Sequence, residues 1–230
     1  MTADSTKPRT RVGVLISGRG SNMGALVEAA AAPGYPAVIA LVISNRPAAP
    51  GLERAGAAGI ETLVIDHKGF ASREAFDDAV HAALVAANIE LVALAGYMRI
   101  QSAGFVDRWI GRQLNIHPSL LPAFKGLHPH KQALDAGVRI AGATVHFVSH
   151  ELDGGPIVAQ AAVRVLDGDT VASLEARILE AEHRLYPHAL RLVSDGTARL
   201  VDGRVRMPPA TEAGAPLFAP SLAGSPDPLS

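Results

Sequence analysis

The chain has 230 residues, of which 48% are hydrophobic and 19% are charged, as expected of a globular protein with one sizeable domain. Its 21 Lys and Arg residues are balanced by 22 Asp and Glu residues, so the sequence carries no surplus of positive charge for binding nucleic acid or a membrane surface. The absence of cysteine excludes disulfides, thiolate metal ligands and cysteine nucleophiles, and it favours a cytoplasmic location.

The two ends of the chain differ in composition from the middle. Residues 1–10 are polar and lack the apolar core of a signal peptide, so we interpret them as a disordered leader. Residues 208–230 are rich in Pro and Ala and bury too little apolar surface to offset the entropy of ordering them, so we expect a flexible tail. The folded domain is expected at residues 11–207. Its most apolar stretch, residues 82–98, is shorter than the roughly 20 residues that span a bilayer.

The first half of the domain alternates apolar runs with helix-length segments. The runs are rich in β-branched residues and continuous, which is typical of parallel strands covered on both faces: 12–16, 38–43, 62–65 and 91–94. The segments between them have helical spacing, and the third has Ser72 as its expected N-cap: 22–32, 51–58 and 72–87. This alternation predicts a parallel sheet with right-handed crossovers.

The pattern changes after residue 112. We expect a strand at 112–117, a mobile loop from Pro118 to about His130, and then two strands, a helix and a hairpin, at 143–148, 157–165, 170–194 and 199–206. The predicted fold class is therefore α/β. It is a single Rossmann-like domain whose mostly parallel, twisted sheet has helices on both faces and a C-terminal antiparallel part.

The segment Ser17-Gly-Arg-Gly-Ser-Asn22 joins the first expected strand to the first helix, where backbone N–H groups and the helix dipole favour an anion. Met23 stands where a dinucleotide-binding loop needs its third glycine, and no acid closes the second strand at 44–46. A single phosphate group is therefore a better ligand than NAD or ATP. An ordinary tight turn is the alternative.

Three further residues carry candidate chemistry. Asn115 and His117 are two apart on one expected strand, so they share a face at its carboxyl end, where an amide can hold an oxyanion and an imidazole can move protons. Asp153 lies in a Gly-Gly turn, and an acid near the imidazole would favour its charged form or orient a water. A structural histidine and a turn aspartate are the alternatives.

Glu182 lies at the margin of the apolar stripe of the last long helix, where an acid either reaches solvent or faces a ligand. The remaining histidines suggest a metal site by their short spacings, at His128 with His130 and at His146 with His150. No His-Glu-x-x-His helix occurs in the sequence, and the extended context provides no tetrahedral set of ligands, so we predict no metal.

Four segments are specific enough to indicate a family: Leu15-Ile-Ser-Gly-Arg-Gly-Ser-Asn22, Leu94-Ala-Gly-Tyr-Met-Arg-Ile100, Leu114-Asn-Ile-His-Pro-Ser-Leu-Leu-Pro122, and Val145-His-Phe-Val148 with Glu151-Leu-Asp-Gly-Gly-Pro156. Together they resemble the phosphoribosylglycinamide formyltransferase family, in order and at the family's spacing, from about residue 12 to residue 207. The segments 114–122 and 152–156 are shared with other 10-formyltetrahydrofolate enzymes. The Gly-Ser-Asn loop and the Glu-His pair at 182 and 183 favour the glycinamide member.

The resemblance implies transfer of a formyl group from 10-formyltetrahydrofolate to the amine of 5-phosphoribosylglycinamide, in purine biosynthesis and without metal. It implies three catalytic residues, Asn115, His117 and Asp153. It assigns the substrate phosphate and ribose to Gly20, Ser21, Asn22 and Glu182. It assigns the folate to Arg73, Met98, Arg99, Ile100, Val148 and Asp153.

The sequence departs from the family pattern at Arg19 in the phosphate loop, at His150 in the turn, and at Gln101, where an apolar residue often lines the folate pocket. The alternatives are a formyltetrahydrofolate hydrolase, a methionyl-tRNA formyltransferase and a non-catalytic phosphate-binding module. Only a short leader precedes the first strand, and no basic surplus or large C-terminal domain is apparent, so the glycinamide reading is preferred. We expect small-molecule substrates, and a monomer or homodimer.

Overall fold

The computed structural model describes residues 8–209 together with residues 217 and 219. Its strands and helices follow in chain order: β1 Thr10–Ile16, α1 Ser21–Ala31, β2 Ala37–Ser44, α2 Pro50–Ala57, β3 Glu61–Val64, the 3₁₀ turn η1 His67–Gly69, α3 Arg73–Ala86, β4 Leu91–Leu94, α4 Ala103–Trp109, β5 Gln113–His117, α5 Pro129–Asp135, β6 Ile140–Phe147, β7 Ile157–Arg164, α6 Val171–Ser194, β8 Arg199–Val201 and β9 Arg204–Arg206. The predicted leader and tail lie mostly outside the described residues.

Seven strands form one sheet in the order β3-β2-β1-β4-β5-β6-β7. The strands from β3 to β5 pair in parallel, whereas β6 is antiparallel to both β5 and β7. This confirms the predicted mostly parallel sheet with an antiparallel C-terminal part. The strand order reverses between β1 and β4, and open α/β sheets bind ligands in the crevice beyond the carboxyl ends of strands at such a point.

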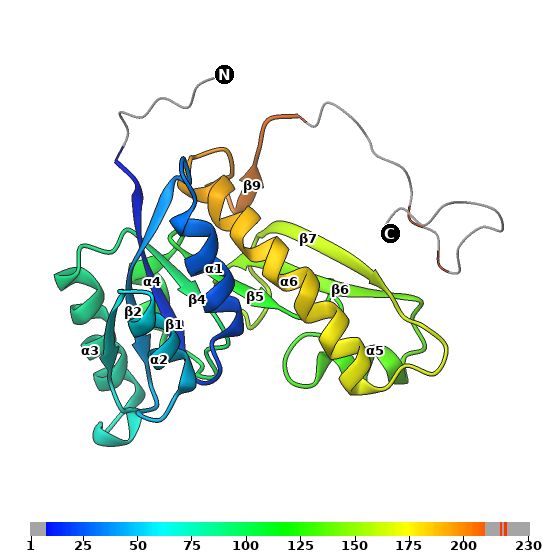
Figure 1. Cartoon of the computed structure of the whole chain (residues 1–230), viewed down its shortest axis with the longest axis horizontal. Helices are drawn as coiled ribbons and strands as arrows, with labels where there is room; N and C mark the ends of the chain where they lie inside the picture. Colours follow the sequence, from blue (N-terminus) through cyan, green and yellow to red (C-terminus); the bar gives the residue numbers. More distant parts are fainter. Residues whose placement is uncertain (1–7, 210–216, 218, 220–230) are drawn as a thin grey trace.

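Helices cover both faces of the sheet (Figure 1). On one face, Val12, Val14 and Ile16 of β1 belong to a hydrophobic cluster that includes residues of α1 and α6. On the other face, Leu15 of β1 packs in a second cluster with residues of α3 and α4, including Trp109. This alternation along β1 follows from the two-residue period of a strand, because neighbouring side chains point to opposite faces.

Three local features differ from the expectation. The strand β3 is exposed at all of its positions, and the exposed fractions of Leu63 and Val64 are 38% and 42%. It is the edge strand of the sheet, and it is not covered on both faces as the sequence predicted. The short helices α4 and α5 were not predicted. Each has seven residues, too few to show a clear apolar period. Within the described part of the chain, no helix is long and apolar enough to cross a membrane.

Candidate active site

The carboxyl half of β5 holds Asn115 and His117 on one face of the sheet. The alternate residues Leu114 and Ile116 belong to the hydrophobic cluster on the α6 side, so Asn115 and His117 face the α3 and α4 side. His117 is 6% exposed, whereas Asn115 is half-buried. The predicted common face is therefore present.

Asp153 reaches His117 from the turn between β6 and β7. Its Oδ2 lies 3.4 Å from His117 Nδ1, and both side chains are less than 10% exposed (8% and 7%). The other ring nitrogen, Nε2, lies 3.0 Å from the carbonyl oxygen of Phe124. Both ring nitrogens thus face an acceptor, an arrangement that a protonated imidazole satisfies because it donates from both nitrogens.

The glycines of the turn allow this approach of Asp153. A Cβ atom at Gly155 would clash with the backbone carbonyl oxygen of Phe147, whereas one at Gly154 would meet only the exposed side chain of Glu151, which can move. Asp153 itself adopts a positive φ of 49°, which aspartate tolerates better than most residues. The close approach of the turn to the end of β6 therefore requires a glycine at position 155.

His146 is a member of the site that sequence reasoning missed. It lies directly opposite Asn115 in the antiparallel pairing of β5 with β6. Its Nδ1 lies 3.0 Å from the carbonyl oxygen of Phe147, so Nδ1 carries the proton, and Nε2 accepts from Asn115 Nδ2 at 3.3 Å. Burial lowers the pKa of His146, which supports this neutral form. Its Nε2 is also 3.8 Å from Asp153 Oδ1.

The loop before α1, which we predicted to bind a phosphate, forms the second part of the candidate site. Gly20 is the N-cap of α1 with φ 68°, a left-handed conformation that glycine adopts without strain. A Cβ atom there would lie 2.9 Å from Cα of Gly51, so this loop and the start of α2 are in close contact. A cavity of about 300 Å³ opens at this position, and its lining residues run from Ser17 to Asn22 and include Arg46, Ala95, Gly96 and Met98.

Glu182 on α6 joins this loop. Asn22 Nδ2 donates a 2.7 Å hydrogen bond to Glu182 Oε2, and both residues are buried. Burial raises the pKa of Glu182 to about 7, and the bond from Asn22 opposes the rise in part. Asn22 Oδ1 is buried without a partner. The predicted phosphate and ribose residues are thus brought together.

Two arginines, Arg19 and Arg46, are the charged residues among those lining this cavity. Arg19 makes a loose ion pair with Glu175 at 3.7 Å, and the Arg46 guanidinium makes no hydrogen bond or ion pair within the described residues. Arg46 follows the buried Asn45, whose Oδ1 accepts from Ser17 Oγ at 2.6 Å. The sequence could have indicated Arg46 as a candidate ligand-binding residue, because residues 44–46 lie at the end of the second strand, at the edge of the sheet where ligands bind.

A family model described as formyl transferase matches residues 10–190 of this chain. The chain belongs to the formyl transferase family. This confirms the family resemblance of the sequence motifs. The formyl transferase family also supports a folate-type co-substrate.

Individual relatives agree with the family. A phosphoribosylglycinamide formyltransferase of Escherichia coli is 44% identical over 203 residues, which cover 85% of this chain and 95% of that protein. The human trifunctional purine biosynthetic protein adenosine-3 is 51% identical over 194 residues, which cover 84% of this chain and 19% of that protein. This formyl transferase chain thus spans about a fifth of the length of the human and bovine trifunctional relatives.

Solved structures confirm the fold. A glycinamide ribonucleotide transformylase from Symbiobacterium toebii superposes with a TM-score of 0.84 at 49% identity, covering 86% of this chain and 94% of that one. A phosphoribosylglycinamide formyltransferase from Brucella melitensis gives 0.78 at 57% identity, covering 81% and 96%. The formyl transferase fold therefore extends over most of the chain.

The residues predicted to bind the folate come from the start of α3, the segment after β4 and the turn after β6. Met98 and Ile100 are 66% and 63% exposed, so two large apolar side chains remain open to a ligand. Met98 is held by its backbone N–H, which donates to Ser17 Oγ at 2.9 Å. Arg73 is exposed in the first turn of α3.

Arg99 and Val148 are placed by the hydrophobic cluster of α3 and α4. The Arg99 guanidinium lies over the ring of Phe76, with Cζ 4.8 Å from the ring centroid. Val148 packs against the cluster that contains Phe76, and its N–H donates to the carbonyl oxygen of Gln113 at 2.9 Å. The start of the turn that carries Asp153 is thereby tied to the start of β5.

The loop after β5, which we predicted to be mobile, is folded over His117 and Asp153. Besides the contact of the Phe124 carbonyl with His117, Gly126 N donates to Asp153 Oδ2 at 2.9 Å. Lys125 Nζ lies 2.6 Å from Glu151 Oε1 in the turn after β6. In this structure the loop after β5 therefore covers His117 and Asp153.

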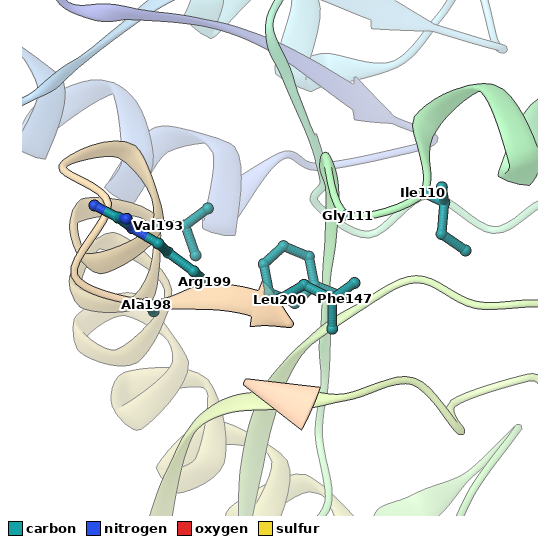
Figure 2. Close-up of a pocket in the computed structure, with 7 residues that line it drawn as sticks. All are labelled: Ile110, Gly111, Phe147, Val193, Ala198, Arg199 and Leu200. Carbon is teal, nitrogen blue, oxygen red and sulfur yellow. The ribbon is translucent and has the colours of Figure 1, made fainter. Parts of the chain in front are cut away.

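Another cavity, of about 380 Å³, is lined by residues that do not include His117, Asn115 or Asp153 (Figure 2). Its walls come from the turn before β5, the end of β6, the end of α6 and β8: Ile110, Gly111, Phe147, Val193, Ala198, Arg199 and Leu200. None of these lining residues has a carboxyl or imidazole group, so the cavity lacks a group for proton transfer. Among the described residues, no group of three or more potential ligands is suited to a metal ion.

Proposed function

We propose that this chain transfers a formyl group from 10-formyltetrahydrofolate to the amine of 5-phosphoribosylglycinamide, giving formylglycinamide ribonucleotide and tetrahydrofolate in purine biosynthesis. The observation that carries this proposal is the meeting of Asn115, His117 and Asp153 on one face of the sheet. Family membership and the names of the relatives support the same reaction.

The phosphate end of the amine substrate is assigned to the loop before α1. Backbone N–H groups of Gly20, Ser21 and Asn22 at a helix N-terminus suit a phosphate. Glu182 is assigned to the ribose hydroxyls, since a carboxyl group accepts hydrogen bonds from hydroxyls and lies next to Asn22. The unpaired Oδ1 of Asn22 is a further acceptor for this substrate.

The folate end is assigned to the segment after β4 and the turn after β6, and Met98 adjoins the phosphate end as well, because it also lines the cavity at the loop before α1. The exposed side chains of Met98 and Ile100 offer apolar surface for a flat ring system. Arg99 and Arg73 supply positive charge at this side of the molecule. Val148 and Asp153 belong to the turn that closes over the ring.

10-Formyltetrahydrofolate supplies the formyl carbon, and attack by the amine develops negative charge on the formyl oxygen. Asn115 donates to this oxygen from the amide N–H that is not directed at His146. His117 donates from Nε2 after the Phe124 carbonyl has moved away. A preorganised donor of this kind contributes roughly 3 kcal/mol to transition-state stabilisation.

Asp153 acts beside the imidazole. Its contact with Nδ1 orients His117 and stabilises the charged ring, and its carboxylate helps to pass the proton from the attacking amine to the departing folate nitrogen. No residue is required to form a covalent bond with the formyl group.

The experiment that tests the proposal incubates the purified chain with 10-formyltetrahydrofolate, with and without the glycinamide substrate. We expect consumption of the folate only when the amine is present, together with a formylated product. Consumption without the amine would instead identify a formyltetrahydrofolate hydrolase, and no consumption would identify a binding module. We propose the cytoplasm as the location, in line with the absence of cysteine.

A further inference from the structure

Two glutamine side chains are bonded to each other beside the site. Gln113 Nε2 donates to Gln101 Oε1 at 2.6 Å. Gln113 is fully buried and Gln101 is partly buried. Gln101 is also the position at which the sequence departs from the apolar residue that often lines the folate pocket of the family. Gln101 therefore places an amide where an apolar side chain was expected, and Gln113 is its hydrogen-bond partner.

Each amide keeps one polar atom without a partner. Gln101 Nε2 and Gln113 Oε1 are both buried and make no hydrogen bond. Turning both amides over would exchange the two residues' roles, yet one NH₂ group and one carbonyl oxygen would still remain free. Buried polar groups are normally paired because leaving them unpaired destabilises the fold, so this donor and acceptor indicate a missing partner.

The pair lies next to the catalytic residues. Gln113, Asn115 and His117 alternate along β5, so all three face the same side of the sheet. The rise of a strand places Gln113 about 7 Å from Asn115. Gln101 directly follows Met98, Arg99 and Ile100 in the chain. Gln113 therefore lies on the same face as Asn115, two residues before it along β5.

We propose that Gln101 and Gln113 recognise the lactam edge of the pteridine ring, where a ring carbonyl stands next to a ring N–H. The free NH₂ group donates to the ring carbonyl, and the free amide oxygen accepts from the ring N–H. This inference rests on the proposed function and names two specificity-determining residues for its folate. Both free atoms are buried, so the ring reaches them only after the groups that cover them have moved aside.

The test measures binding by calorimetry without the amine substrate, so that no turnover occurs. The probes are 10-formylfolate and its 4-deoxy analogue, in which hydrogen replaces the ring carbonyl oxygen and the neighbouring ring nitrogen loses its proton. The proteins are the wild type, Gln101→Met/Gln113→Met, and the control Gln160→Met. Methionine matches glutamine in length without its amide. The Gln160 amide bonds Leu121 O and Thr144 Oγ1, which lie outside the folate side of the site.

We expect the wild type and the control to prefer 10-formylfolate over the 4-deoxy analogue, and the double variant to lose on the order of tenfold of that preference. An unchanged preference in the double variant would overturn the inference alone, while the proposed function would stand. Failure of the wild type to bind either probe would overturn the 10-formyltetrahydrofolate assignment, and this inference with it.

Thermal unfolding keeps the test independent of folding defects. The double variant removes both unpaired atoms, so we expect a Tm at or above that of the wild type. Gln101→Met alone leaves the amide of Gln113 without its partner, so its Tm should be lower than that of the double variant. If the double variant does not fold, Gln101→Met serves as the binding variant, with the same loss expected and the same unchanged preference overturning the inference.

Discussion

Asn22 and Glu182 are 160 residues apart in the chain and are joined by a buried hydrogen bond of 2.7 Å. The bond links the first turn of α1 to the middle of α6, the two helices that cover the same face of the sheet. It brings a carboxyl group into a place from which most water is excluded. This has a measurable effect on the stability of the protein as the pH changes.

Burial raises the pKa of Glu182 from its ordinary value of 4.5 to about 7, so folding favours the protonated carboxyl between these values. The contribution of Glu182 to the free energy of unfolding is complete below pH 4.5 and is lost as the pH rises through about 7. We expect the wild type to lose up to about 3 kcal/mol of unfolding free energy from this group between pH 5 and 8, whereas Glu182→Gln loses none of it.

Urea unfolding of both proteins at pH 5 and pH 8 measures this difference. Glu53→Gln, at an exposed position on α2, is the matched control and should follow the wild type. Parallel pH profiles for the wild type and Glu182→Gln would contradict the prediction.

Several features of the site followed from sequence alone because they depend on local periods. Asn115 and His117 share a face through the two-residue period of a strand, and the glycines around Gly20 marked the loop before α1. The partnership of Asp153 with His117 needed the path of a turn, which sequence spacing does not define. The role of His146 needed the register of β5 against β6, so its sequence position suggested only a metal ligand.

The contact of His117 with Asp153 should matter for turnover more than for binding. Asp153→Asn removes the charge beside the imidazole, and His117→Ala removes the proton carrier, while the residues assigned to the substrate phosphate remain. We expect kcat to fall by roughly 10²–10⁴-fold with little change in KM, as for other general acid–base groups. Steady-state kinetics with each substrate varied in turn would measure the effects on kcat and on KM separately. A rise in KM with kcat unchanged would refute the assignment.

Arg46 should contribute to binding of the phosphorylated substrate. Its guanidinium lines the cavity at the phosphate loop, and charge-assisted hydrogen bonds to phosphate are among the stronger polar contacts. Because the side chain is exposed, we expect Arg46→Gln to raise KM for this substrate by about tenfold with kcat unchanged. Inhibition by inorganic phosphate should weaken in parallel.

Arg139→Gln is the control for the loss of a surface arginine, since Arg139 pairs with Asp167 on an exposed surface. It should leave both constants at their wild-type values. Equal KM values for the wild type and Arg46→Gln would show that the backbone of the loop binds the phosphate without this side chain.

The loop after β5 should open during turnover. The carbonyl of Phe124 occupies His117 Nε2, the nitrogen that must face the formyl oxygen, and Lys125 ties this loop to Glu151. The Lys125 pair is partly exposed to solvent and is worth less than about 1 kcal/mol. We therefore expect Lys125→Ala to speed hydrogen exchange across residues 118–130 by at most about fivefold without lowering kcat, because opening precedes the reaction.

Hydrogen–deuterium exchange, followed by mass spectrometry of a peptide that spans this loop, measures the exchange rate of residues 118–130 in each variant. Lys131→Ala is the matched control, because it removes a similar exposed pair, with Asp135, that does not reach the site. A fall in kcat for Lys125→Ala alone would mean that the covered arrangement is the reactive one. In that case the Phe124 carbonyl would orient the imidazole during the reaction, and Asn115 alone would donate to the formyl oxygen.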